Sequence, residues 1–230
     1  MQLQNQHVLV TGGFGTLGLA VVRAALAAGA RVTAVDRAKA PAIDAPAGAH
    51  LLGDVDLADA ATAAATFDRI AAGGGGLDAL VNVAGTFRWE TVEGGSLDTW
   101  DLLYRVNLRT AVAASKAALP HLVARGGGSI VNVGAGAAAK AGAGMGAYAA
   151  SKSGVARLTE ALAEELKDRA ITVNAVLPSI IDTPPNRADM PKADFDRWVK
   201  PAQLADVIVF LLSPQARAIT GALIPVSGRV

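Results

Sequence analysis

A tyrosine and a lysine lie four residues apart at the end of the stretch "NVGAGAAAKAGAGMGAYAASK", which covers residues 132–152. Tyr148 and Lys152 occupy positions i and i+4, so they share one face if this segment is a helix. A phenol has an ordinary pKa of about 10, and a neighbouring ammonium group stabilises the phenolate and lowers that pKa. The pair therefore predicts acid–base chemistry at Tyr148. The alternative is that Tyr148 only packs and Lys152 is solvated.

A glycine-rich turn lies near the N-terminus, in the segment "TGGFGTLG" at residues 11–18. Gly12, Gly15 and Gly18 follow an apolar run and precede a segment rich in alanine and leucine. Between a strand and a helix, such glycines permit a tight turn, the approach of a pyrophosphate to the backbone, and close packing of the helix on the strand. The free N–H groups of the helix N-terminus then attract phosphates. The pattern predicts a dinucleotide-binding turn, with an ordinary turn as the alternative.

The second apolar run ends in an acidic residue, Asp36. A carboxylate at this place accepts hydrogen bonds from the ribose diol of adenosine and repels a 2′-phosphate. Asp36 therefore favours NAD(H) as the cofactor. Arg37, the next residue, is able to pair with a 2′-phosphate, so NADP(H) is the alternative.

Short apolar runs alternate with longer helical patterns along the chain. The long helix is expected to be interrupted near Pro120, and no composition break marks a domain boundary. Near-continuous apolar strands that alternate with helices predict an α/β fold. We expect a Rossmann-type doubly wound parallel sheet of about seven strands, with helices on both faces, in a single domain over residues 1–230. The expected strands are 7–11, 31–36, 50–54, 77–84, 128–134, 170–178 and 221–228, and the expected helices are 15–28, 57–71, 97–123, 146–167 and 201–212.

Composition excludes several classes of function. The net charge is +1 without a basic run, which argues against nucleic-acid and anionic-membrane surfaces. There is no cysteine, and the three histidines (His7, His50 and His121) lack ligand-like spacing, so no metal site is expected. The N-terminus does not have the pattern of a signal peptide, and no apolar run predicts a transmembrane helix. We therefore expect a cytoplasmic protein that acts on a small molecule.

These features together resemble the short-chain dehydrogenase/reductase family, over essentially the whole chain. "NVAG" at 82–85 is similar to the family's Asn-Asn-Ala-Gly, with Val83 in place of the second Asn, and Asn107 lies in a matching "VNL". Tyr148 and Lys152 match the family's Tyr-x-x-x-Lys. The remaining matches are the glycine turn, Asp54-Val55 after the third strand, and the loop with Pro178, Asp182 and Thr183 after the sixth.

The resemblance implies roles for individual residues. It implies that Tyr148 exchanges the proton, that Lys152 tunes Tyr148 and holds the nicotinamide ribose, and that Asn107 helps to hold a proton-relaying water. It also implies a cofactor site that holds the carboxamide with Thr183 and the backbone near Ile181. The full set of implied cofactor-binding residues is Gly12, Gly15, Thr16, Leu17, Gly18, Asp36, Arg37, Asp54, Val55, Asn82, Ala84, Gly85, Tyr148, Lys152, Pro178, Ile181 and Thr183.

One family residue is missing. The family usually has a serine at the position of Ala135, where its hydroxyl bonds the reacting carbonyl oxygen. Loss of such a donor costs about 10²–10³ in rate. No hydroxyl side chain occurs between Asn132 and Tyr148, and neither Ser129 nor Ser151 is placed to replace it.

The dihydropteridine reductase branch of the family also lacks this serine, because its conjugated quinonoid substrate has less need of a polarised carbonyl. This chain resembles that branch in "GA" at 134–135, "GM" at 144–145 and the stretch 176–198, although Asn107 is more typical of the broad family. Four side chains are candidates to line a flat aromatic site, with core or subunit contacts as the alternative: Phe87, Trp89, Met145 and Trp198.

The expected function is therefore NAD(H)-dependent hydride transfer, with quinonoid dihydropterin or another conjugated acceptor as the substrate. Two alternatives stay open. The first is a carbonyl or 3-oxoacyl reductase that tolerates Ala135, and the second is a non-catalytic NAD-binding sensor or scaffold. The resemblance also implies a homodimer or homotetramer, assembled through the helices at 97–123 and 148–167.

Overall fold

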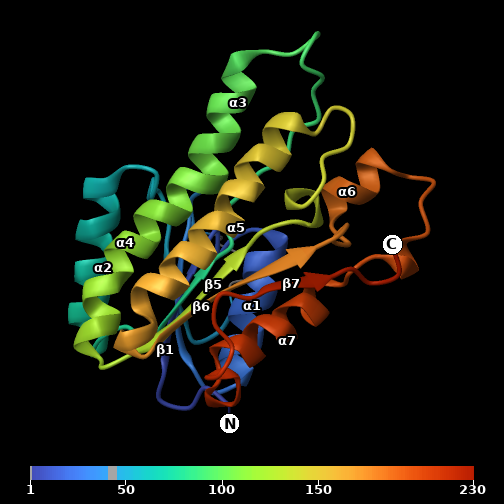
Figure 1. Ribbon diagram of the computed structural model, residues 1–230. Coiled ribbons are helices and arrows are strands. Elements are labelled where there is room, and N and C mark those ends of the chain that lie inside the picture. The colour runs from blue at the N-terminus through green and yellow to red at the C-terminus, as the bar shows by residue number, and fades with distance from the viewer. Residues whose placement is uncertain (1, 41–45) are drawn as a thin grey trace.

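The computed structural model describes residues 2–40 and 46–230. Its centre is a seven-stranded parallel sheet with the strand order β3-β2-β1-β4-β5-β6-β7 (Figure 1). The expected Rossmann-type doubly wound sheet is confirmed. Its strands are β1 (His7–Thr11), β2 (Arg31–Val35), β3 (Ala49–Leu52), β4 (Ala79–Asn82), β5 (Gly128–Val133), β6 (Ile171–Pro178) and β7 (Leu223–Val226).

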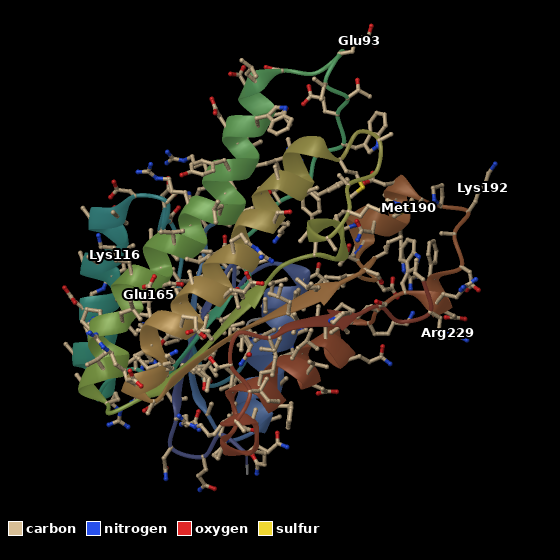
Figure 2. The ribbon with its side chains drawn as sticks, viewed as in Figure 1. Glu93, Lys116, Glu165, Met190, Lys192 and Arg229 are labelled. Carbon is tan, nitrogen blue, oxygen red and sulfur yellow. The ribbon has the colours of Figure 1, made fainter. Side chains whose placement is uncertain are left out.

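Helices cover both faces of the sheet. Helices α2, α4 and α5 lie on one face, and α1 and α7 lie together on the other (Figure 1). The loop before α3 reaches far beyond the sheet, with Glu93 at its tip (Figure 2). The helices are α1 (Thr16–Ala27), α2 (Ala60–Gly74), α3 (Leu97–Leu103), α4 (Thr110–Ala124), α5 (Gly146–Leu166), α6 (Pro184–Asp189) and α7 (Pro201–Leu212).

The strands are apolar on both sides because each side has a helical layer to pack against. On β1, Val8 and Val10 belong to the core under α1 and α7, whereas Leu9 belongs to the core under α2, α4 and α5. Successive strand residues point to opposite faces, so one apolar run supplies both cores.

The long helix differs from the expectation at two places. It does not end at Pro120, because α4 continues through that residue to Ala124; the missing N–H removes one intrahelical hydrogen bond without ending the helix. The irregularity lies earlier instead, where a π-helix at Tyr104–Arg109 joins α3 to α4. Single π-helical turns are frequent at functional sites.

The loop after β6 contains the short helix α6. Thr183 is the N-cap, its hydroxyl accepts a bond from the Asn186 N–H at 3.4 Å, and Pro184 takes the first helical position. Among the described residues, no helix is long and apolar enough to cross a membrane. Short 3₁₀ helices occur at Gly136–Ala138, Lys167–Arg169, Phe195–Arg197 and Pro214–Ala216.

Candidate active site

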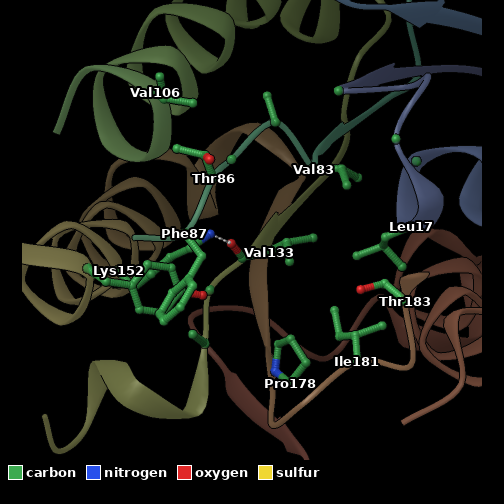
Figure 3. A pocket seen from close by; sticks show the side chains of 18 of the residues that line it. Leu17, Val83, Thr86, Phe87, Val106, Val133, Lys152, Pro178, Ile181 and Thr183 are labelled. Carbon is green, nitrogen blue, oxygen red and sulfur yellow. Dashed lines mark hydrogen bonds between the residues drawn. The ribbon is translucent and has the colours of Figure 1, made fainter. Parts of the chain in front are cut away.

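A large cavity opens at the carboxyl ends of the strands, around the point where the strand order reverses between β1 and β4 (Figure 3). Open α/β sheets bind ligands at this topological switch point. The cavity has a volume of about 1430 Å³, which exceeds the size of a typical drug-sized pocket. Its walls come from the segments that follow the strands β1 to β6 and from residues of α3, α4 and α5.

The glycine-rich turn forms one wall, and three of its glycines are required by close contacts. Gly12 has a positive φ of 63°, and a Cβ there would lie 2.7 Å from the backbone of Ala84. A Cβ on Gly18 would lie 2.1 Å from the carbonyl oxygen of Gly12. Gly13 was not among the glycines named from their spacing in the sequence. A Cβ on Gly13 would lie 2.6 Å from the Cβ of Ala34. The turn is therefore packed tightly between β1, β2 and β4.

Gly15 is different, because its missing side chain leaves open space. A Cβ there would meet only the carbonyl oxygen of Gly12, at 3.6 Å. Gly15 is the N-cap of α1, and no side chain caps this helix N-terminus or adds an acid to its first turn. Bare backbone and uncapped N–H groups at a helix N-terminus fit a pyrophosphate. The turn thus fits the dinucleotide that the sequence predicted.

Asp36 lies beside this turn at the end of β2. Its carboxylate accepts hydrogen bonds from the backbone N–H groups of Phe14 (3.1 Å) and Ala38 (3.0 Å), which fix both oxygens at the cavity wall. Arg37 is exposed and also lines the cavity.

The segment after β3 lies only partly in the cavity wall. Asp54 adopts a left-handed backbone with φ of 58°, its side chain is exposed, and it does not line the cavity. The neighbouring Val55 and Asp56 do line it. Asp56 pairs with Arg105 at 2.6 Å, and these two partners were not expected from the sequence.

Tyr148 and Lys152 lie on α5 and both line the cavity, with Tyr148 in the first turn of the helix. Lys152 is 5% exposed, and its Nζ donates a hydrogen bond of 2.7 Å to the carbonyl oxygen of Val133 at the end of β5 (Figure 3). The two residues thus lie in the crevice at the carboxyl ends of the strands.

Burial sets the pKa of both groups. It raises the pKa of Tyr148 to about 12 and lowers the pKa of Lys152 to about 8, because a low-dielectric environment disfavours each charged form. The expectation that the ammonium group lowers the pKa of Tyr148 is therefore wrong for the protein without ligand. Desolvation by burial is the cause of the upward shift of the Tyr148 pKa.

Asn107 is buried beneath the cavity in the π-helix and does not line it. Its Oδ1 accepts from the Thr86 N–H at 2.7 Å, and its Nδ2 donates to the Thr86 carbonyl at 3.0 Å and to Ser151 Oγ at 2.9 Å. Ser151 Oγ in turn donates to the carbonyl of Tyr148 at 2.8 Å. The amide therefore joins the loop after β4 to the helix that carries Tyr148. This network links residues far apart in sequence, and no local pattern signals it.

Asn82, another of the expected cofactor-binding residues, is buried and does not line the cavity. Its Nδ2 donates to Asn132 Oδ1 (2.8 Å) and to Ser115 Oγ (3.1 Å), and Asn132 donates to Thr159 Oγ1 (2.9 Å). These bonds tie β4 and β5 to α4 and α5. The role of Asn82 is to hold the sheet and the helices together beneath the site.

Ala135 lines the cavity where the family usually has a serine, and it is 5% exposed. The 3₁₀ helix that follows it, Gly136–Ala138, contains no hydroxyl group. Ser129 is bonded to Thr172 in the buried sheet, and Ser151 is engaged as described above. Neither of these serines lines the cavity, so neither replaces the missing donor.

Aromatic and sulfur-containing side chains form the outer part of the cavity. Phe87 meets Tyr148 edge-on, with ring centroids 4.9 Å apart and an interplanar angle of 83°. Trp89 is 62% exposed and covers Gly144, where a Cβ would lie 2.1 Å from the indole. Met145 also lines the cavity. Three of the four candidate residues thus surround one space.

Trp198 is the fourth candidate, and its placement in the aromatic site was wrong. It is 4% exposed, packs against Phe195 with ring centroids 4.8 Å apart, and does not line the cavity. The alternative of a core contact is correct for this residue.

Most of the expected cofactor-binding residues line this one cavity. Those that do are Gly12, Gly15, Thr16, Leu17, Gly18, Asp36, Arg37, Val55, Ala84, Gly85, Tyr148, Lys152, Pro178, Ile181 and Thr183. Lining residues that the sequence analysis did not expect include Asp56, Thr86, Arg105, Val133, Ser179 and Met190.

Comparison with known proteins supports the assignment of the fold. Residues 6–194 match the family model for short chain dehydrogenases. The chain belongs to the short-chain dehydrogenase/reductase family. It is 34% identical to D-threitol dehydrogenase of Mycolicibacterium smegmatis, over 99% of this chain and 93% of that protein. It is 32% identical to the 3-oxoacyl-[acyl-carrier-protein] reductase FabG of Vibrio harveyi, over 99% of this chain and 98% of that protein.

A solved structure of a short-chain type dehydrogenase/reductase from Mycobacterium ulcerans superimposes with a TM-score of 0.90 and 28% sequence identity, covering 100% of this chain and 90% of the other. Short-chain dehydrogenases are oxidoreductases that act on small molecules, use NAD(P)(H) and generally form oligomers. The chain is therefore an enzyme, and the non-catalytic sensor or scaffold is not supported.

Proposed function

We propose that this short-chain dehydrogenase transfers hydride between NAD(H) and a conjugated small-molecule acceptor, with quinonoid dihydropterin as the first candidate. One observation carries the proposal. Tyr148 and Lys152 face the same cavity as the bare glycine turn, while Ala135 occupies the position of the usual serine hydroxyl. The site thus offers a proton donor without the hydroxyl that would polarise an isolated carbonyl.

The dinucleotide, when bound, supplies or accepts the hydride. Its phosphates would lie on the backbone of Gly12 and Gly15 and the first turn of α1, and its carboxamide against Thr183 and Ile181. Lys152 would hold the nicotinamide ribose. These residues line the cavity between the glycine turn and the end of β6.

Tyr148 is the proposed proton donor and acceptor at its phenolic oxygen. Because burial raises its pKa to about 12, the phenol is neutral at ordinary pH and ready to donate. Asn107 acts as a positioning residue, since its amide is bonded to Thr86 and Ser151 and has no contact with the cavity.

The preference for NAD(H) rests on Asp36. Its carboxylate is held by two backbone N–H groups at the cavity wall, where it accepts from a ribose diol and repels a 2′-phosphate. Arg37 beside it supports the alternative of NADP(H), and Arg105 is engaged by Asp56.

The conjugated acceptor is supported by two features. Ala135 supplies no donor, and the resemblance of the stretch 176–198 to dihydropteridine reductases includes α6, which lines the cavity. Phe87 and Trp89 add exposed aromatic surface on which a flat ring would pack.

A carbonyl or 3-oxoacyl reductase is the second candidate, and the names of the relatives favour it. They include the FabG enzyme described above and an L-xylulose reductase from Bos taurus that is 32% identical over 99% of this chain and 97% of that protein. In this case a substrate would be reduced without a hydroxyl at position 135.

A screen of NADH and NADPH oxidation separates the two candidates. The substrates are quinonoid dihydropterin, a 3-oxoacyl thioester, a ketose and a simple ketone, all at matched concentrations. The proposal predicts that kcat/KM for the quinonoid compound exceeds that for every ketone by at least about tenfold. If a ketone or the thioester is the best substrate, the carbonyl or 3-oxoacyl reductase replaces the reductase of a conjugated acceptor as the favoured function.

We also propose that the chain forms a homodimer or homotetramer through α4 and α5. Tyr104 and Val112, on the π-helix and α4, are 55% and 41% exposed and would be covered by such an interface. Sedimentation of the purified protein tests the proposal; a monomer at micromolar concentration would contradict it.

A further inference from the structure

One wall of the cavity is a loop between β6 and α7. We define residues 183–199 as the lid. Thr183, Pro185, Asn186, Asp189 and Met190 of the lid line the cavity. In Figure 2, Lys192 on the outer turn of the lid points away from the body of the protein.

The two ends of the lid are joined by backbone hydrogen bonds. Ile181 and Val199 form a parallel bridge. The Asp182 N–H donates to the Val199 carbonyl at 2.8 Å, and the Val199 N–H donates to the Ile180 carbonyl at 3.0 Å. The lid therefore has a closed neck.

Asp182, at this neck, binds two cations from opposite ends of the lid. Arg187 on α6 donates through Nε and Nη2 at 2.5 and 2.8 Å, and Lys200 donates through Nζ at 2.8 Å. The Asp182 side chain is only 9% exposed. A forked guanidinium–carboxylate pair fixes direction as well as distance. One carboxylate thus ties α6 to the start of α7.

Both cations also contact the far half of the lid. The Arg187 guanidinium lies 4.6 Å from the centroid of the Phe195 ring, and Lys200 Nζ donates to the Phe195 carbonyl at 2.8 Å. Phe195 packs on the buried Trp198. The cluster formed by Asp182, Arg187 and Lys200 therefore joins α6 to Phe195 in the second half of the lid.

The base of this cluster is anchored in the core of the protein. Lys200 directly precedes α7, whose Leu204 and Ile208 are fully buried. Arg197 donates to the Arg229 carbonyl at 2.8 and 2.6 Å, so the C-terminal segment holds the last turn of the lid (Figure 2). Two side chains of α6 form hydrogen bonds with residues outside this helix. Arg187 donates to Asp182, and Asn186 donates to the Ile181 carbonyl at 2.8 Å.

We propose that Asp182 is a positioning residue that holds the lid over the cavity through Arg187 and Lys200, and so sets the place in the cavity wall of Thr183, the proposed carboxamide contact, and of Met190. This inference rests on the proposed function, because it assigns the lid to the site of hydride transfer. Without the carboxylate, two cations would face each other across the neck. Their repulsion and the loss of the shared carboxylate would loosen the attachment of α6.

Asp182→Asn removes the charge and keeps the shape, and Asp196→Asn is the matched control. Asp196 lies 3.9 Å from the same Lys200, but its side chain is 90% exposed, so its loss leaves the Asp182 contacts intact. Hydrogen exchange read by mass spectrometry reports on the lid directly. In Asp182→Asn we expect the amides of residues 187–198 to exchange at least about tenfold faster, with those of β5 unchanged. The control is expected to match the parent in both segments.

Steady-state kinetics with the best substrate of the screen supply the second readout. A displaced lid weakens substrate binding more than chemistry, so KM should rise about tenfold in Asp182→Asn while kcat changes by less than about threefold. The control should keep both constants. A fall in kcat with KM unchanged would overturn the proposal, because it would place Asp182 in the chemistry.

A mutant cycle tests whether the two charges act as a pair. Arg187→Gln should loosen the lid by itself, and the double variant Asp182→Asn/Arg187→Gln should exchange no faster than Asp182→Asn, because the repulsion is then relieved. Strictly additive effects of the two substitutions on hydrogen exchange would contradict the proposal that Asp182 and Arg187 act as a pair.

Two exchange results would overturn the proposal. Lid amides that exchange at the parental rate would show that Asp182 does not hold the lid. Faster exchange in the lid and in β5 alike would show that Asp182 stabilises the whole fold instead. Exchange is measured without substrate, so a protein that turns over no compound in the screen refutes the proposed function while the exchange result still decides on the lid.

Discussion

The ammonium group of Lys152 donates a hydrogen bond of 2.7 Å to the carbonyl oxygen of Val133, the last residue of β5. This bond anchors the cation at the carboxyl end of the sheet, one helical turn from Tyr148. Burial lowers the pKa of Lys152 to about 8 and raises that of Tyr148 to about 12. Near neutral pH the pair therefore consists of a neutral phenol on Tyr148 and an ammonium group on Lys152, which loses its proton more readily than an ordinary lysine does.

The first prediction concerns the alkaline limb of the pH profile. If the charged form of Lys152 is required, kcat/KM for reduction should fall as pH rises through about 8, because the proton leaves the lysine there. The phenol of Tyr148 stays protonated up to about pH 12 and does not contribute to this limb. Initial rates between about pH 6 and 10 measure the limb.

Lys152→Arg supplies the control for this limb, because a guanidinium keeps its proton throughout that range. The variant should be slower at neutral pH, since Arg does not fit the lysine's place, but its remaining activity should not fall near pH 8. A limb at the same pH in the variant would assign the titration to another group.

The second prediction concerns Ala135. Ala135→Ser restores a hydroxyl at the cavity wall, so kcat/KM for a simple ketone should increase by about tenfold to a hundredfold. Turnover of a conjugated acceptor should change by less than about threefold, because its charge is already delocalised. Kinetics of both substrates with both proteins test this contrast. Equal gains on the two substrates would show that the missing hydroxyl does not set the substrate class.

The third prediction compares two glycines of the same turn. In Gly18→Ala the Cβ would overlap the Gly12 carbonyl oxygen at 2.1 Å, so the free energy of unfolding should fall by about 2 to 3 kcal/mol. In Gly15→Ala the Cβ meets open space, so stability should change by about 1 kcal/mol or less. The same Cβ would occupy the phosphate site, and the dissociation constant for NADH should rise at least about tenfold. Urea unfolding and NADH titration distinguish the two effects; unchanged NADH affinity in Gly15→Ala would remove the turn from the cofactor site.

The fourth prediction concerns the choice of cofactor. Asp36→Asn removes the charge that would repel a 2′-phosphate, so the ratio of kcat/KM for NADPH to that for NADH should rise at least about tenfold. Asp54→Asn is the matched control, because its exposed carboxylate does not line the cavity. The control should leave the ratio unchanged. A similar rise of this ratio in both variants would show that the loss of any nearby negative charge favours NADPH, and would not assign the cofactor preference to Asp36.

The fold was predictable because its signals are local. Continuous apolar runs such as that around Val8 and Leu9 are typical of strands covered on both faces, and the glycines of the first turn lie directly after one of them. The strand and helix patterns therefore sufficed for the doubly wound sheet. The interruption expected at Pro120 was wrong because a helix already held by packing tolerates the loss of one hydrogen bond.

The parts that the sequence did not reveal depend on contacts between distant residues. The amide of Asn107 is engaged by Thr86 and Ser151, which no spacing rule links to it. Trp89 and Trp198 are the same residue type, and the sequence alone does not distinguish their surroundings. Trp89 is exposed in the cavity wall, whereas Trp198 is buried against Phe195. The pKa of Tyr148 depends on desolvation, which is a property of the folded site and not of the four-residue spacing.

The central claim is that the phenol of Tyr148 exchanges a proton with the substrate beside a bound dinucleotide, and Tyr148→Phe tests it most directly. The variant keeps the ring that meets Phe87 edge-on and loses only the hydroxyl. Its dissociation constant for NADH should stay within about threefold of the parent value, while kcat for the best substrate should fall at least about a hundredfold. A variant that turns over as fast as the parent would contradict the account.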